Sequence, residues 1–151
     1  MNKTKKYELV YSIIKSVIAE EDNLVANLAN TCAILKEHFG HHWVGYYLVD
    51  EKSNSLVLGP FQGPLACTRI PYGKGVCGSS WKSGKALIVV DVHEFDGHIA
   101  CSAETNSEIV VPLERNGAIL GVLDIDSVRK SEFDAVDREF FCKINKLILS
   151  T

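Results

Sequence analysis

The chain has 151 residues, a hydrophobic fraction of 46% and a net charge of −3. This size predicts one globular domain, residues 1–151, that buries a core of its own. The acidic balance, with a pI of about 5.9, excludes the basic face that nucleic-acid binding requires. No segment approaches the length of a membrane span, so neither nucleic acid nor membrane is expected as a partner.

The first segment, MNKTKKYELVYSIIKSVIAEED, has the basic start of a signal peptide. Glu8 and Lys15 interrupt its apolar stretch, however, and no small-residue cleavage site follows. Apolar residues recur at helical spacing over 7–19, which predicts an amphipathic helix and a cytoplasmic protein.

The remaining elements are read from apolar periodicity and turn residues. A second helix is expected from Leu24 to near Gly40, followed by a strand hairpin at 43–50 and 55–61. The expectations that follow are a short extended segment at 66–71, a Gly-rich turn and short helix at 73–85, a strand at 86–91, a long loop at 92–106, strands at 107–114 and 117–126, and a helix from about Ser131, whose SEFD resembles a capping sequence.

The connections between strands indicate how the sheet is arranged. The tight turns near 50–55 and 114–117 favour antiparallel pairing. Helices from both ends of the chain are then available to cover the sheet. The predicted fold class is α+β, a central antiparallel sheet flanked by N- and C-terminal helices.

Three carboxylates converge in this arrangement. Asp124 and Asp126 are two apart on one strand and therefore share a face. If the 114–117 turn makes a hairpin, Glu108 lies at the same end of the neighbouring strand. These acids are either a polar strand end, an acid-catalysis or cation-binding cluster in which one carboxyl keeps its proton, or ligands for a hard cation. No DxDxDG loop is present, and no metal is expected.

The five cysteines are an odd number, without a CxxC pair, in a chain with no export signal. This pattern argues against a structural disulfide framework or a zinc knuckle. Cys32 lies on an apolar helical stripe, which indicates core. Cys67, Cys77 and Cys101 lie in polar or Gly-rich loop segments, where thiols are easier to reach and oxidise. They are either small fillers of crowded loops or redox-active groups.

Two further groups lie near these candidates. His93 and His98 lie in the long loop near Cys101, where histidines are able to lower the pKa of its thiol. Trp43 and Tyr47 are four apart on a strand and share a face. Such aromatic pairs are mostly core, but they also line pockets for apolar side chains.

Three segments together resemble a known family. GPFQGPLACTRIPYGKGVCG, VVDVHEFDGHIACSAETNSEIVVPL and GVLDIDS resemble the free methionine-(R)-sulfoxide reductases, which are built on a GAF domain. The resemblance runs from about Trp43 to Ser127. It implies a single GAF domain, commonly a homodimer, that reduces free L-methionine (R)-S-oxide without a cofactor and is restored by thioredoxin.

The resemblance also implies roles for individual residues. Cys101 matches the catalytic cysteine, Cys67 the resolving cysteine, and Cys77 a third, assisting cysteine. The matching acidic and aromatic positions, for catalysis and substrate binding, are Glu108, Asp124, Asp126, Trp43 and Tyr47. One departure is Ser102, which stands where an aspartate often follows the catalytic cysteine.

Other functions fit parts of this pattern. A GAF domain that senses a small ligand needs no reactive thiol, and this chain has no second domain to signal to. A thiol peroxidase uses the same cysteines but needs no acidic pocket. An interaction protein, with all five cysteines as filler, forms no disulfide under oxidant.

Overall fold

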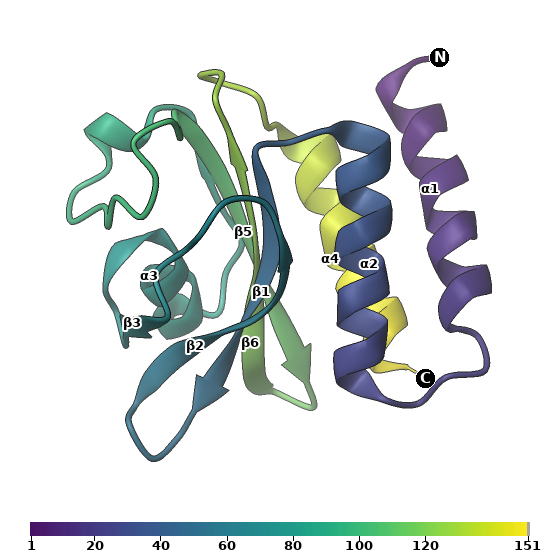
Figure 1. Ribbon diagram of the computed structural model, residues 1–151, viewed down its shortest axis with the longest axis horizontal. Coiled ribbons are helices and arrows are strands. Elements are labelled where there is room, and N and C mark those ends of the chain that lie inside the picture. Colours follow the sequence, from purple (N-terminus) through teal and green to yellow (C-terminus); the bar gives the residue numbers. More distant parts are fainter. Residues whose placement is uncertain (151) are drawn as a thin grey trace.

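The computed structural model describes residues 1–150 and confirms an α+β fold (Figure 1). Its elements, in chain order, are α1 (Lys3–Ile18), α2 (Leu24–Phe39), β1 (Trp43–Asp50), β2 (Ser55–Gln62), β3 (Arg69–Pro71), α3 (Gly75–Ser83), β4 (Leu87–Val89), the 3-10 turn η1 (Val92–Glu94), β5 (Ser107–Arg115), β6 (Ala118–Ser127) and α4 (Ala135–Leu149). None of the helices in this part of the chain is long and apolar enough to cross a membrane.

The six strands form one antiparallel sheet in the order β3-β2-β1-β6-β5-β4. Both predicted hairpins, β1–β2 and β5–β6, are present. The three longest pairings lie in the middle of the sheet, while the two edge strands have three residues each. Such short edge strands offer few unpaired main-chain groups, which limits pairing of the sheet with strands of other chains.

Helices cover the two faces of the sheet unequally. In Figure 1, α2 and α4 lie against one face and α1 packs outside them, whereas α3 and the loop around η1 lie on the opposite face. Alternating side chains of the strands follow this division, because successive residues of a strand point to opposite faces. Val44 and Tyr46 join the helix-side core, while Trp43 and Tyr47 join a smaller cluster with residues of α3.

Helix ends differ from the sequence prediction at two places. Helix α1 begins at Lys3, four residues earlier than expected, because Asn2 caps it by accepting from the N–H of Lys5. Helix α4 begins at Ala135 rather than near Ser131. The true cap is Asp134, which forms a capping box with Asp137, whereas Ser131 has a positive φ of 57° and lies in the preceding turn.

Candidate functional site

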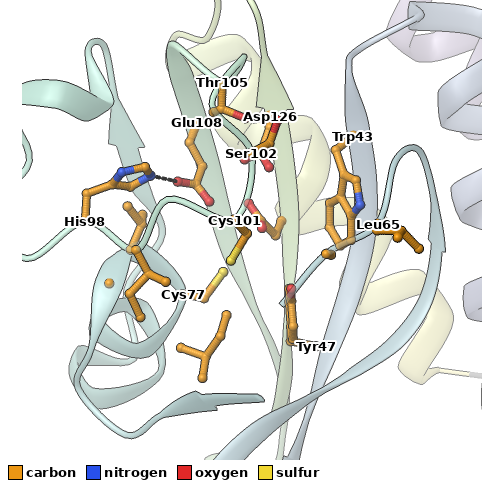
Figure 2. A pocket seen from close by; sticks show the side chains of 16 residues that line it. Trp43, Tyr47, Leu65, Cys77, His98, Cys101, Ser102, Thr105, Glu108 and Asp126 are labelled. Atoms are coloured by element: carbon orange, nitrogen blue, oxygen red, sulfur yellow. Dashed lines mark ion pairs between the residues drawn. The ribbon is translucent and has the colours of Figure 1, made fainter. Parts of the chain in front are cut away.

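Register across the central strands brings the three predicted acids together. Glu108 on β5 lies directly opposite Asp126 on β6, and Asp124 lies opposite Val110. On the other side of β6, Asp126 pairs with Trp43 of β1. The three acids and Trp43 share the α3 side of the sheet and line one pocket (Figure 2). The predicted convergence of Glu108, Asp124 and Asp126 is therefore present.

These acids are buried beside one another without a strong cation. Glu108 and Asp124 are each 6% exposed. The ion pairs formed among residues 1–150 bring no lysine or arginine to the three carboxyl groups. Burial, and then the charges of Asp124 and Asp126, raise the pKa of Glu108 well above its usual range. Burial and the charge of Asp124 likewise raise the pKa of Asp126.

The acids also have unused hydrogen-bonding capacity. One oxygen, Oδ1, of Asp124 and one of Asp126 are buried without a hydrogen-bond partner in the described chain. Buried polar atoms in folded proteins are nearly always satisfied, so such exceptions mark places where a ligand supplies the partner. A ligand with several N–H donors and a positive charge suits this cluster.

Cys67 and Cys101 form a disulfide, with their Cα atoms 5.5 Å apart. Cys67 lies between β2 and β3, and Cys101 lies in the long loop that precedes β5. The main chain of Cys67 is held by Tyr47, whose hydroxyl donates to the Cys67 carbonyl at 2.8 Å. The two cysteines that the resemblance pairs are thus within bonding distance, and one of them, Cys101, lines the acidic pocket.

Cys77 differs from the sequence prediction. It lies on α3, not in a loop, and only 4% of it is exposed, because α3 packs onto the sheet. Burial, and then the charges of Asp124 and Glu108, raise the pKa of its thiol. Its sulfur nevertheless points into the same pocket as Cys101 (Figure 2). Cys77 is therefore a neutral, enclosed thiol rather than an accessible one.

Trp43 and Tyr47 share a face of β1, as their spacing predicted, and they form one wall of the pocket. Their ring centroids are 5.8 Å apart, and the Trp43 indole N–H donates to the carbonyl of Pro64 at 3.1 Å. Gly45 makes this arrangement possible. A Cβ at that position would lie 2.3 Å from Cη2 of Trp43, so only glycine lets the indole lie over the strand.

The histidines near Cys101 behave differently from one another. His98 lines the pocket, with Nε2 3.8 Å from Oε1 of Glu108. Burial is the main cause of a lowered pKa for His98, which favours its neutral form. His93 is exposed and contacts Asn106 instead.

Several pocket residues were not predicted from the sequence. Leu65 lines the entrance although it is 90% exposed, and Thr105 lines it with a buried, unpartnered hydroxyl. Ser102, the departure from the family pattern, lies within 3.1 Å of Nε2 of His42. An isolated apolar residue in a Gly-Pro loop was the only available signal for Leu65. The other two contacts depend on how the long loop folds back.

The pocket has a volume of about 40 Å³ in this disulfide form, more than the ~10–15 Å³ that one buried water requires. Sulfur and oxygen ligands for a cation also meet here. One ligand atom from each of Cys77, Glu108 and Asp124 lies within 4.8 Å of the others. The arrangement thus combines a disulfide, a buried acid cluster and an aromatic wall.

A six-stranded antiparallel sheet, with helices on one face and a loop-covered pocket on the other, is the architecture of a GAF domain. The sequence profile of the GAF domain family matches residues 23–142. Among solved structures, the free methionine-R-sulfoxide reductase of Neisseria meningitidis in complex with its substrate superposes with a TM-score of 0.97. It is 51% identical and covers 99% of this chain and 90% of its own.

Sequence relatives agree with this structural likeness. The free methionine-R-sulfoxide reductase of Escherichia coli is 44% identical, over 100% of this chain and 93% of its own length. GAF domain-containing protein A of Dictyostelium discoideum is 52% identical, over 97% and 92%. The chain belongs to the enzyme family of free methionine-R-sulfoxide reductases.

Proposed function

We propose that this enzyme reduces free L-methionine (R)-S-oxide to L-methionine through a thiol and disulfide cycle. The observation that carries the proposal is the Cys67–Cys101 disulfide, whose Cys101 lines the same pocket as three buried acids. Similarity to reductases with the same substrate name, one of them a substrate complex, supports it.

The first step is attack of the Cys101 thiolate on the sulfoxide sulfur. The oxygen passes from the methionine sulfur to the Cys101 sulfur, and protons are delivered as the sulfur–oxygen bond of the substrate breaks. A carboxyl group held neutral by its acidic neighbours is a suitable donor, and both Glu108 and Asp126 meet that condition. The products are methionine and a sulfenic acid on Cys101.

The second step closes the disulfide. The Cys67 thiol condenses with the sulfenic acid, forming the Cys67–Cys101 bond and releasing water. Thioredoxin then opens this bond by thiol–disulfide exchange and becomes oxidised itself. Cys77, beside Cys101 in the pocket, is placed to act as a substitute resolving thiol. The cytoplasm, where thioredoxin keeps thiols reduced, is the matching compartment, and a homodimer is the expected assembly.

The acid cluster provides selection for a free amino acid. The α-ammonium of free methionine sulfoxide offers a positive charge and several donors to Asp124 and its neighbours. Peptide-bound methionine sulfoxide has no such group, so its binding would leave the buried carboxyl oxygens unpaired. Trp43 and Tyr47 then contact the apolar part of the substrate.

The test is methionine release from the R and S epimers of methionine sulfoxide, each free and N-acetylated, with thioredoxin or dithiothreitol as reductant. Release from the free R epimer alone supports the proposal. Cys101→Ser is expected to abolish methionine release. Cys67→Ser is expected to retain one turnover, with more methionine released when dithiothreitol is the reductant than when thioredoxin is. Cys142→Ser, which changes a partly buried thiol of α4 outside the pocket, is the matched control. Full activity of Cys101→Ser refutes the mechanism, and no release from any of the four compounds favours a ligand-sensing GAF domain.

A further inference from the structure

One thiol and two carboxyl groups of the pocket have the chemistry of a metal site. Cys77 comes from α3, Glu108 from β5 and Asp124 from β6, and each is at least 94% buried. Their nearest ligand atoms all lie within 4.8 Å of one another. Zinc bound by sulfur at about 2.3 Å and by oxygen at about 2.1 Å needs ligand atoms roughly 3.5 Å apart, so a contraction of about 1 Å completes the site.

A second observation points to a cation at this place. The buried Oδ1 of Asp124 has no hydrogen-bond partner, although the rest of the residue is enclosed. Asp126, next to it, also has a buried oxygen without a partner. The cluster therefore has spare electron pairs inside the cavity, in addition to three groups that become anionic on losing a proton.

The state of the cysteines decides which thiol is available to a metal ion. The Cys67–Cys101 bond is closed in this structure, and the cavity beside Cys101 has a volume of about 40 Å³. This is enough room for an ion and bound water, since one buried water needs only ~10–15 Å³. In this form Cys67 and Cys101 are bonded to each other, which leaves Cys77 as the pocket's free thiol.

From this geometry we infer that the disulfide form binds a thiophilic divalent cation, Zn²⁺ in particular, through Cys77, Glu108 and Asp124. A thiolate ligand selects Zn²⁺ over Mg²⁺ and Ca²⁺, which prefer oxygen alone. On binding, the proton of the Cys77 thiol passes to the buffer as the sulfur–zinc bond forms. The fourth position is left for water or for the unpartnered oxygen of Asp126.

The inference has a regulatory consequence, and in this respect it rests on the proposed function. Zn²⁺ and the substrate ammonium need the same carboxyl groups. Zn²⁺ bound to the disulfide form keeps that form out of the cycle, and it is therefore expected to inhibit thioredoxin-dependent turnover uncompetitively with respect to free methionine sulfoxide, which binds the reduced form. Metal binding itself is measured without turnover, so the two proposals fail separately.

The direct test uses Co²⁺ and Zn²⁺ on the purified disulfide form, with the Cys67–Cys101 bond verified by peptide mass spectrometry. A thiolate ligand gives Co²⁺ a near-ultraviolet charge-transfer band, which Zn²⁺ should remove by displacement. The band is expected in the unaltered protein and in Cys142→Ser, and is expected to be lost in Cys77→Ser. Asp124→Asn keeps the thiol and should weaken Zn²⁺ binding at least about tenfold.

The alternatives give different results. No band in the unaltered protein refutes the site. A band that survives Cys77→Ser and disappears in Cys142→Ser identifies adventitious binding at Cys142 and refutes the site. Circular dichroism verifies that each variant is folded. If Cys77→Ser is unfolded, the effect of Asp124→Asn on Zn²⁺ binding decides whether the site exists. Binding without methionine release in the turnover assay would leave the metal site standing and remove the proposed function.

Discussion

Two buried carboxyl groups on opposite faces of the sheet have opposite surroundings. Asp137, on the helix side, is 1% exposed and accepts hydrogen bonds from the Tyr7 hydroxyl, the Lys3 ammonium and the main-chain N–H of Asp134. Asp124, on the pocket side, has a buried oxygen without a partner and acidic neighbours. The chain itself satisfies the carboxylate that supports the fold, whereas it leaves an oxygen of the pocket carboxylate without a partner.

Matched substitutions on the two faces test this contrast. Asp124→Asn is expected to lower kcat/KM for free methionine (R)-S-oxide by at least about 100-fold, because in the proposed complex it removes the carboxylate that pairs with the substrate ammonium. The melting temperature should not fall, since the substitution relieves repulsion among the acids. Steady-state kinetics and thermal unfolding measure the two effects. A normal kcat/KM would exclude Asp124 from substrate binding.

Asp137→Asn should show the reverse behaviour. It removes the charge that pairs with Lys3 and disturbs the capping box of α4. The free energy of unfolding is expected to fall by about 3 kcal/mol, while kcat/KM at a temperature where the protein is folded stays unchanged. Urea denaturation gives the stability. Loss of activity without loss of stability would contradict the division between the faces.

His41 predicts how acid affects the helix side. Burial lowers its pKa from 6.5 to about 4, and it packs between Phe39 and Phe133. The folded protein favours the neutral form of His41. The contribution of this residue to the free energy of unfolding is therefore complete above pH 6.5 and is lost as the pH falls toward 4. The loss is about 2 kcal/mol after allowance for partial exposure. Comparing His41→Phe with the unaltered protein at pH 7 and pH 4.5 isolates it, and equal losses in both proteins would refute it.

Glu108 predicts the opposite sign on the pocket side. Its folded-state pKa is raised, so the folded protein holds the proton more tightly than the unfolded chain. The contribution of Glu108 to the free energy of unfolding is therefore largest below its unfolded-state pKa of 4.5 and falls as the pH rises above that value. Glu108→Gln should therefore raise the melting temperature at pH 7 by about 2–4 °C, corresponding to ~1 kcal/mol. The gain should vanish at pH 4, and a gain that persists there would indicate a cause other than ionisation.

Much of the acid cluster was predictable because strand geometry is periodic. A spacing of two fixes Asp124 and Asp126 on one face, and a tight hairpin fixes the strand end at which Glu108 lies. The hairpins themselves followed from turn residues between apolar runs. These features depend only on neighbouring residues in the sequence, which is why local patterns predicted them.

The rest depended on contacts between distant segments. The burial of Cys77 requires α3 to pack on the sheet, which no local pattern in a Gly-rich stretch reveals. The start of α4 was placed too early because Ser131 and Asp134 each have an acid three residues later. Only Asp134 forms the capping box, while Ser131 has a positive φ in the preceding turn. The positions of Leu65 and Thr105 follow from two loops that meet over the pocket. The pairing of Cys67 with Cys101 came from family resemblance, not from spacing.

The Cys67–Cys101 bond also determines the order of events in the proposed cycle. While Cys101 is bonded to Cys67 its sulfur is not a thiolate and does not attack a sulfoxide, so each sulfoxide waits until the reductant has opened the bond. Oxidation of the enzyme by the sulfoxide and its reduction by thioredoxin are then separate half-reactions. The rate law for the proposed cycle is accordingly a double displacement, with parallel lines in double-reciprocal plots at different thioredoxin concentrations.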